Sequence, residues 1–298
     1  MQSKLHSSSR PYLYGTCIIS PSPHYIQVAK ACSLDFVFLD TEHIPLDRHQ
    51  LSWMCRSYAE ASIPCIVRVP SVLDASGGAT QVLDGGAAGV VAPYIETMEQ
   101  VLALVGQCKL RPLKGSLLET CKDRLRTIAV QRLSTSQTTS YNDPLQYLTD
   151  ILPKETIAFM QASNQSTNLL FINIESQKGI VNLPQLLNVP GIDGVFIGPH
   201  DLSVNLGVPC QWNSKVFLDA CDTIVVECAA RGLSVGNHYS FDNAIIYQKR
   251  WRALGANLCI HMTDMKLFQS ALAKDLEELR GGDGNGNDTD AQCKVDDV

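Results

Sequence analysis

The sequence predicts a single closed (β/α)8 barrel. Eight short apolar runs rich in β-branched residues recur along the 298 residues, and most of the intervals between them can hold a helix. These runs are apolar on both faces, which is typical of parallel strands covered by crossover helices. A barrel of this type commonly uses about 250 residues as one domain. An open, doubly wound sheet is the structural alternative.

The expected strands and helices alternate along the chain. We expect strands at residues 15–19, 36–40, 65–69, 89–92, 169–175, 194–198, 233–236 and 257–261. Helices are predicted between them because Pro, Asp or Thr stands near their starts and Gly near several of their ends. These helices are expected at residues 23–31, 47–61, 74–85, 96–108, 144–164, 183–187, 214–231 and 241–254, with a closing helix at 264–279.

Three segments interrupt this pattern. A long insertion after strand four, residues 109–168, contains a Ser/Thr/Gln stretch at 134–140 that indicates local mobility, and we expect the insertion to cover the barrel mouth. Residues 1–11 are predicted to be a flexible N-terminus, and the Gly/Asp-rich residues 281–298 a disordered tail. The barrel domain is therefore predicted to span residues 12–280.

Composition excludes several classes of partner. The 24 Lys and Arg against 30 Asp and Glu leave no basic excess for a nucleic-acid backbone. No apolar run approaches the roughly 20 residues that span a bilayer, and no apolar export signal stands at the start. We therefore expect a cytoplasmic protein with neither a nucleic-acid nor a membrane partner. The eleven cysteines form no C-x-x-C pair, and most of them are expected to be reduced core side chains.

Reactive side chains gather where the predicted strands end. In a parallel barrel these carboxyl ends form the active-site face. Each side chain alone has a simpler explanation, such as a helix cap for Glu175 or Asp201 or an internal ion pair for Arg68. Together they predict a site, because buried charges are costly unless they serve a metal or a substrate. The residues at strand ends are Asp40, Thr41, Glu42, His43, Arg68, Glu175, Pro199, His200, Asp201, His238 and His261.

The two carboxylates Glu175 and Asp201, with no thiol pair, favour a hard cation such as Mg²⁺ or Mn²⁺ over zinc. A metal held in this way can bind a 2-oxo acid and stabilise the enolate that forms when an adjacent C–C bond breaks. Arg68 would add positive charge at the enolate oxygen. His43, whose ordinary pKa lies near 6.5, could transfer protons.

Five segments of the chain resemble one known family. They are residues 36–45 (FVFLDTEHIP), 67–70 (VRVP), 82–90 (VLDGGAAGV), 174–176 (IES) and 190–203 (PGIDGVFIGPHDLS). In this order they resemble the HpcH/HpaI aldolase family, the metal-dependent class II 2-oxo-acid aldolases that include macrophomate synthase. The resemblance extends over residues 12–279.

The resemblance implies roles for individual residues. Glu175 and Asp201 match the metal ligands, for Mg²⁺ or Mn²⁺ with Co²⁺ as a further option. Arg68 matches the residue that contacts the pyruvyl oxygen, His43 the acid/base, and Asp84 the aspartate that partners that histidine.

The resemblance also implies substrate contacts by Asn173, Pro199 and His200. Asn173 replaces a more usual Gln, His200 stands where Ala is common, and the insertion is atypical. The implied assembly is a homo-oligomer, a hexamer built as a trimer of dimers with exchanged C-terminal helices.

Four functions follow, in descending order of expectation. The first is retro-aldol cleavage of a 4-hydroxy-2-oxo acid, a small molecule, to give a pyruvate enolate. The second is decarboxylation of oxaloacetate with addition of the enolate to another substrate, as in macrophomate synthase. A CoA-ester lyase ranks lower because no Gly-rich nucleotide loop follows a strand. A non-catalytic barrel ranks last because the site residues are intact.

Overall fold

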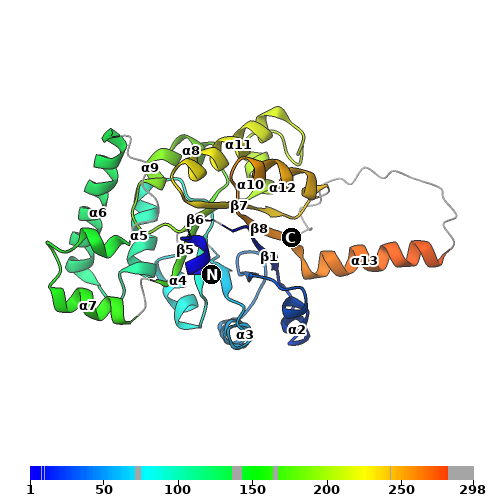
Figure 1. Cartoon of the computed structure of the whole chain (residues 1–298), viewed down its shortest axis with the longest axis horizontal. Coiled ribbons are helices and arrows are strands. Elements are labelled where there is room, and N and C mark those ends of the chain that lie inside the picture. Colours follow the sequence, from blue (N-terminus) through cyan, green and yellow to red (C-terminus); the bar gives the residue numbers. More distant parts are fainter. Residues whose placement is uncertain are drawn as a thin grey trace.

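The computed structural model of the chain contains a closed barrel of eight parallel strands (Figure 1), as predicted. It describes residues 1–7, 9, 11–70, 75–135, 143–163, 167–241 and 243–280. The strands follow one another around the barrel in sequence order, and β8 closes it against β1. They are β1 (Leu13–Cys17), β2 (Phe36–Asp40), β3 (Cys65–Arg68), β4 (Gly89–Ala92), β5 (Leu169–Ile174), β6 (Gly194–Ile197), β7 (Ser234–Tyr239) and β8 (Leu258–Thr263).

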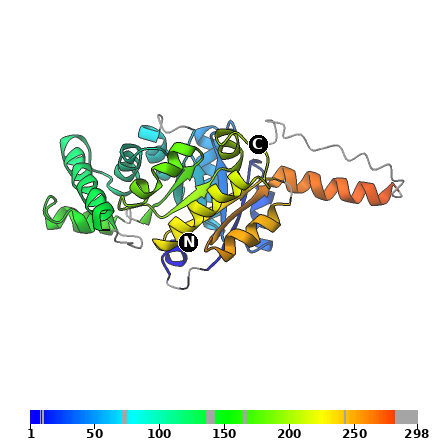
Figure 2. The same ribbon diagram turned by 90° about the horizontal axis from the view of Figure 1, so that it is seen from above.

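Helices cover the outside of the barrel and connect its strands (Figure 2). Several begin with side-chain caps; Asp47 and Thr97 each form a capping box with the glutamine three residues on. The helices of the barrel layer are α2 (His24–Ala31), α3 (Arg48–Glu60), α4 (Ala75–Asp84), α5 (Met98–Lys109), α8 (Gln177–Val181), α9 (Leu183–Leu187), α10 (Pro199–Asn205), α11 (Lys215–Ala230) and α12 (Ala244–Ala253).

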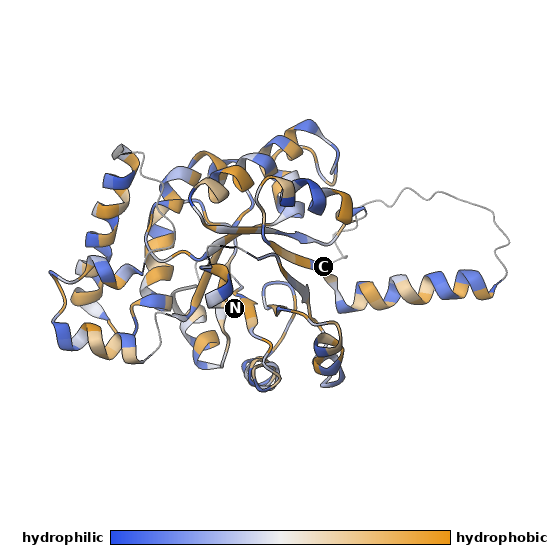
Figure 3. Ribbon diagram, viewed as in Figure 1, coloured by the Kyte–Doolittle hydropathy of each residue, from blue (hydrophilic) through white to orange (hydrophobic). Residues whose placement is uncertain are grey.

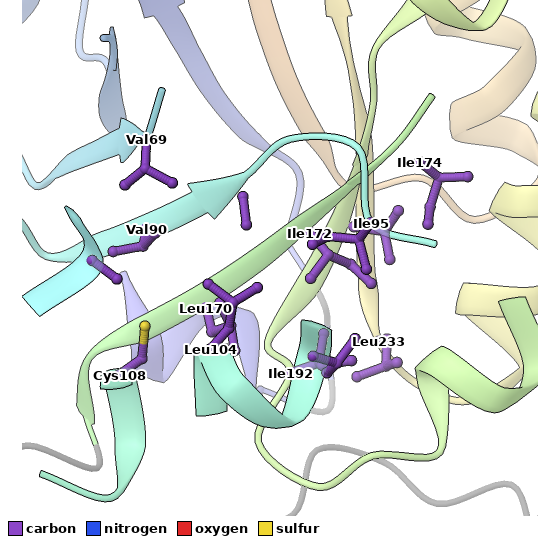
Figure 4. Close-up of a cluster of buried hydrophobic side chains, with 14 of the residues drawn as sticks. Val69, Val90, Ile95, Leu104, Cys108, Leu170, Ile172, Ile174, Ile192 and Leu233 are labelled. Carbon is purple, nitrogen blue, oxygen red and sulfur yellow. The ribbon is translucent and has the colours of Figure 1, made fainter. Parts of the chain in front are cut away.

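Two apolar layers stabilise the barrel. Inside it, Phe36, Phe38, Phe171 and Phe196 are almost fully buried and fill the space between the strands. Outside it, the second layer packs the strands against the helices, as β4, β5 and their neighbours illustrate (Figure 4). This alternation sends every second residue of a strand into the barrel, so Arg68 and Asn173 point inward at its mouth.

The segment at 1–11, for which we expected flexibility, contains a short helix in its described part. Helix α1 (Gln2–Leu5) places Leu5 against Leu13 and the other inner-barrel residues, leaving it 2% exposed. The next residue, His6, bonds through Nε2 to Asp193 Oδ1 at 2.9 Å. The segment is held because it covers the apolar amino-terminal end of the barrel, a tertiary contact that local composition does not reveal.

The insertion also lies elsewhere than expected. It forms α6 (Gly115–Thr135), which was not predicted, and a 3-10 helix η1 (Pro144–Tyr147) and α7 (Lys154–Ala162), where one helix was expected. Helix α6 packs beside α5 and α9 on the flank of the barrel (Figure 1). A helix that follows a parallel strand returns the chain to the amino-terminal end, so an insertion after α5 emerges opposite the mouth. Residues 136–140 of the Ser/Thr/Gln stretch and the tail at 281–298 lie outside the described residues.

Helix α13 (Asp264–Leu279) extends away from its own barrel (Figures 1 and 2). Apolar residues lie along it without cover (Figure 3). The exposed ones are Met265, Leu267, Phe268, Leu272 and Leu279, at 40–81%. Among the described helices, none combines the length and apolarity needed to cross a membrane.

Candidate active site

A cavity of about 200 Å³ opens at the carboxyl ends of the strands and brings together most of the predicted site residues. Its polar walls carry Asp40, His43, Arg68, Glu175, His200, Asp201, His238 and Ser240. Pro199 and Gly198 line it as well, whereas no described residue of the insertion does. The structure therefore has a cavity at the barrel mouth, where the sequence predicts the site.

Glu175 follows β5 and is buried at 2% exposure, as is Asp40. Asn173 Nδ2 donates to its Oε1 at 2.8 Å, and the backbone N–H of Tyr94 donates to its Oε2 at 2.9 Å. Burial raises the pKa of Glu175, while the positive charge of Arg68 opposes this rise. A Cβ atom at Gly198 would stand 2.0 Å from Glu175 Oε1, so only glycine leaves room for this carboxylate.

Asp201 lies in the first turn of α10, directly after β6. Tyr94 donates its hydroxyl hydrogen to Asp201 Oδ1 at 3.1 Å, and Asn205 Nδ2 donates to the same hydroxyl oxygen at 3.1 Å. Tyr94 adopts a left-handed conformation with a φ of 50°, which turns its backbone toward Glu175 and its ring toward Asp201. One residue after β4 thus connects both predicted metal ligands.

Arg68 ends β3 and is enclosed by carboxylates. Its Nε donates to Asp40 Oδ1 at 2.9 Å, and its Nη2 pairs with Asp40 Oδ2. Its Nη1 lies 3.1 Å from Glu42 Oε2 and 4.0 Å from Glu175 Oε1. These bonds keep the pKa of Asp40 below its usual value despite burial, whereas burial raises the pKa of Glu42 to about 7. The guanidinium is thereby held rigidly beside Glu175.

His43 follows β2 at the rim of the cavity, where its side chain is 40% exposed. Its Nε2 lies 3.6 Å from Glu42 Oε2. Partial burial and then the charge of Arg68 lower its pKa below the usual 6.5. His43 is therefore neutral at neutral pH, the form in which an imidazole can accept a proton.

Of the predicted catalytic residues His43, Arg68 and Asp84, Asp84 is the one that does not line the cavity. It ends α4, and its carboxylate pairs with Arg111 at 2.6 Å while remaining 62% exposed. Helix α4 runs from the mouth back toward the amino-terminal end of the barrel, so its last residue lies far from His43. Within this chain the expected pairing of Asp84 with His43 is absent from the described contacts.

Two of the three predicted substrate-contact residues line the cavity, and the third does not. Pro199 and His200 line the cavity, and His200 Nε2 lies 3.1 Å from Ser240 Oγ. Asn173 instead supports Glu175, and its own Oδ1 is buried without a hydrogen-bond partner in the described structure. His261 lines a separate groove beside α2 and α13.

Sequence reasoning assigned no role to Asp40, Glu42 or Tyr94. Asp40 and Glu42 stand at the end of β2, where an ion pair with Arg68 was foreseeable because strands two and three are neighbours. Tyr94 follows β4, so the rule that selected the other strand ends also applies to it. Its bonds to Glu175 and Asp201 depend on the left-handed backbone, which the sequence does not signal.

Relatives with assigned activities match most of the chain. The 4-hydroxy-4-methyl-2-oxoglutarate aldolase cghB of Chaetomium globosum is 23% identical over 252 residues, covering 84% of each chain. The hydroxypyruvate/pyruvate aldolase of Agrobacterium fabrum is 25% identical over 256 residues, covering 86% of this chain and 85% of the relative.

Solved structures show the same fold. The HpcH/HpaI aldolase of Desulfitobacterium hafniense superposes with a TM-score of 0.72 at 21% identity, over 94% of this chain and 96% of that one. Macrophomate synthase superposes with a TM-score of 0.66 at 21% identity, over 95% of this chain and 90% of that one. The citrate lyase beta subunit of M. tuberculosis, complexed with oxaloacetate and magnesium, reaches a TM-score of 0.51 at 15% identity, over 87% and 93% of the two chains.

The family model of the HpcH/HpaI aldolase/citrate lyase family matches residues 14–263, from the first strand of the barrel to the last. The matched region contains every residue that lines the mouth cavity. This chain is a member of the HpcH/HpaI aldolase/citrate lyase family.

Proposed function

We propose that this protein is a metal-dependent carbon–carbon lyase that cleaves a 4-hydroxy-2-oxo acid to pyruvate and an aldehyde. The observation that carries the proposal is the joining of Glu175 and Asp201 by Tyr94, with the Arg68 guanidinium 4.0 Å from Glu175. This arrangement places two oxygen ligands and a fixed positive charge in one cavity. The aldolase activities of the two relatives named above agree with it.

The donor set fits a divalent cation, which we propose to be Mg²⁺ or Mn²⁺. Glu175 and Asp201 supply hard carboxylate oxygens, and Gly198 keeps the space beside Glu175 clear. Over the described residues, no group of three or more His, Cys, Asp or Glu side chains is arranged to hold a metal. Two protein ligands leave the other positions to water and to the oxygens of a 2-oxo acid. The bound cation would supply Lewis acidity at those oxygens.

The chain's own residues then carry the remaining steps. His43, neutral at neutral pH, accepts the proton of the substrate's C4 hydroxyl. As the C3–C4 bond breaks, its electron pair moves toward C2 and the aldehyde leaves. Arg68 stabilises the negative charge that develops on the pyruvyl oxygen. Return of a proton to C3 completes pyruvate.

The test is metal dependence combined with substitution of the ligands. Chelator treatment should abolish aldol cleavage, and Mg²⁺ or Mn²⁺ should restore it. Glu175→Gln and Asp201→Asn should lose both activity and Mn²⁺ binding, measured by electron paramagnetic resonance, while remaining folded. Glu119→Gln, which changes an exposed carboxylate on α6, is the matched control. Full turnover in protein shown to be metal-free would contradict the proposal.

Decarboxylation of oxaloacetate is the second candidate function, and the position of His43 supports it. The histidine lies at the exposed rim, whereas Arg68 and Glu175 lie deep in the cavity. Loss of CO₂ needs no base, so the deep residues alone would suffice for it. Assays with oxaloacetate and with 4-hydroxy-2-oxo acids, with the products followed by isotope labelling, separate the two reactions.

The proposed assembly is a homo-oligomer in which α13 packs on a second copy of the chain. An apolar groove of about 580 Å³ lies beside β1, β8 and α2, where a barrel normally carries a covering helix. Leu267 and Phe268 in the first turns of α13 line one side of this groove, and the rest of the helix extends away from the barrel (Figure 2). The groove is apolar and the helix exposes apolar side chains, which matches a helix exchanged between copies. We expect a hexamer by light scattering, and we expect Leu267→Asp with Phe268→Asp to dissociate it. A monomeric native protein would contradict this assembly.

A further inference from the structure

His238 is a polar residue in the mouth cavity to which the proposed mechanism assigns no role. It lies on β7, opposite β3 in the eight-stranded ring. It pairs with Ile260 of β8, whose side chain lies inside the barrel, so the His238 side chain points inward as well. Its ring lies 5.6 Å from that of Phe38. Its Nε2 is buried without a hydrogen-bond partner in the described part of the chain. A buried polar atom of this kind costs free energy unless a ligand satisfies it.

Two further polar groups share this side of the cavity. His200 begins α10 after β6, Ser240 follows β7, and the two are in hydrogen-bond contact at 3.1 Å. A ring contact with Trp212, 5.0 Å between centroids, orients His200. Among the described residues that line the cavity, His200, His238 and Ser240 are hydrogen-bonding groups beside Asp201, one of the two proposed metal ligands.

The positive charge of the cavity, Arg68, lies on β3, across the barrel from His238 on β7. Among the described lining residues, Arg68 is the only Lys or Arg, and Asp40 and Glu42 already pair with it. Burial and the nearby Arg68 charge lower the pKa of His238 to about 3, so this histidine is neutral at physiological pH. A second carboxylate on the substrate would therefore meet no free positive charge beside His238. A hydroxyl group can donate to a neutral imidazole or accept from it, whichever tautomer is present.

We propose that His238, with the His200–Ser240 pair, forms a subsite for a hydroxyl group on the aldehyde-derived part of the substrate. The preferred substrates are then hydroxylated 4-hydroxy-2-oxo acids, in preference to those that end in a second carboxylate or an alkyl group. This inference rests on the proposed lyase function and names its substrate class. The apolar side chains Ile19, Ile44 and Val204 complete the cavity.

The test is the reverse reaction with three two-carbon aldehydes that differ in one substituent. Pyruvate C3, as the enolate carbon, bonds to the aldehyde carbon, and the aldehyde oxygen takes up a proton to become the C4 hydroxyl. Acetaldehyde carries a methyl group, glycolaldehyde a hydroxymethyl group and glyoxylate a carboxylate. We expect kcat/KM for glycolaldehyde to exceed that for acetaldehyde by about tenfold, the effect of one good hydrogen bond. Glyoxylate should also rank below glycolaldehyde.

Substitution assigns the preference to the subsite. His238→Leu should bring the glycolaldehyde-to-acetaldehyde ratio close to one, whereas His238→Gln, which still donates and accepts, should keep most of it. Ser240→Ala should lower the ratio as well, and it provides a second variant if the leucine protein does not fold. His49→Gln, a histidine exposed on α3, is the matched control.

Pyruvate methyl exchange with deuterium oxide separates this inference from the function it rests on. Exchange needs the enolate site but no aldehyde, so His238→Leu should leave its rate within about twofold of wild type. If the wild type exchanges the pyruvate methyl hydrogens but does not prefer glycolaldehyde over acetaldehyde, the subsite is overturned and the lyase function is not. A His238→Leu protein that loses exchange as strongly as aldol addition would also overturn it, because His238 would then serve the enolate. Absence of exchange in the wild type overturns the lyase function and the subsite together.

Discussion

The Tyr94 hydroxyl donates a hydrogen bond to Asp201 Oδ1 at 3.1 Å, while the backbone of the same tyrosine bonds Glu175. Tyr94 therefore ties the end of β4 to carboxylates that follow β5 and β6. Partners of this kind hold metal ligands in the geometry that the cation requires.

Removing that hydroxyl should weaken metal binding. We expect Tyr94→Phe to raise the dissociation constant for Mn²⁺ by about tenfold or more, the usual effect of losing a ligand's hydrogen-bond partner. Titration calorimetry or electron paramagnetic resonance measures this directly. Tyr147→Phe, which loses a bond from Arg132 in the insertion, is the control and should bind Mn²⁺ as the wild type does. Unchanged affinity in Tyr94→Phe would show that Asp201 needs no such support.

A methyl group at Gly198 should displace the Glu175 carboxylate, because its Cβ would stand 2.0 Å from Oε1. We expect Gly198→Ala to fold but to lose Mn²⁺ affinity by more than about tenfold and to lose turnover with it. Gly78→Ala is the matched control, since its Cβ would meet Val69 at an ordinary 3.8 Å. Normal metal binding by Gly198→Ala would mean that Glu175 can be held in another position.

Arg68→Lys should keep the positive charge but lose the planar, multidentate contact with Asp40. We expect kcat to fall by about 10²- to 10³-fold, as when one donor to a developing oxyanion is removed. Steady-state kinetics with a 4-hydroxy-2-oxo acid measure this effect, and Arg111→Lys, distant from the site, should behave as wild type. A rise in KM alone would make Arg68 a ground-state binding residue.

His43→Ala should distinguish the two candidate reactions. Aldol cleavage requires a base for the C4 hydroxyl, so we expect a loss of about 10²- to 10⁴-fold. Oxaloacetate decarboxylation should fall far less, because CO₂ leaves without a proton transfer. Parallel assays of both reactions on the same preparation provide the comparison. An equal loss of both would mean that His43 positions the substrate and is not the base.

The pH dependence of cleavage should follow the lowered pKa of His43. The base must be unprotonated, so kcat/KM rises as pH increases through this pKa and falls as pH decreases through it. Because burial and Arg68 hold the pKa below 6.5, the acidic limb of the profile should be centred below pH 6.5. A pH–rate profile from pH 5 to 8 measures it. A limb centred above 6.5 would exclude His43, in its observed environment, as the titrating base.

The sequence by itself determined the barrel and the direction of its active face. Runs such as residues 36–40 and 169–174 are apolar on both faces, which only strands covered on both sides can satisfy, and their number and spacing lead to a closed ring. Since all eight strands are parallel, the residues that follow them must meet at one end. The order of the strands alone therefore predicts that Arg68, Glu175 and Asp201 lie at the same end of the barrel.

Only the tertiary structure decided the connections that depend on backbone conformation and long-range packing. Tyr94 contacts two carboxylates because its φ is 50°. Leu5 is buried at the amino-terminal end of the barrel, and Asp84 lies at the end of α4, away from the cavity. None of these relationships is periodic, so no pattern along the chain predicts them. The neutral state of His238 likewise follows from burial opposite Arg68, a relationship across the barrel that the order of residues does not contain.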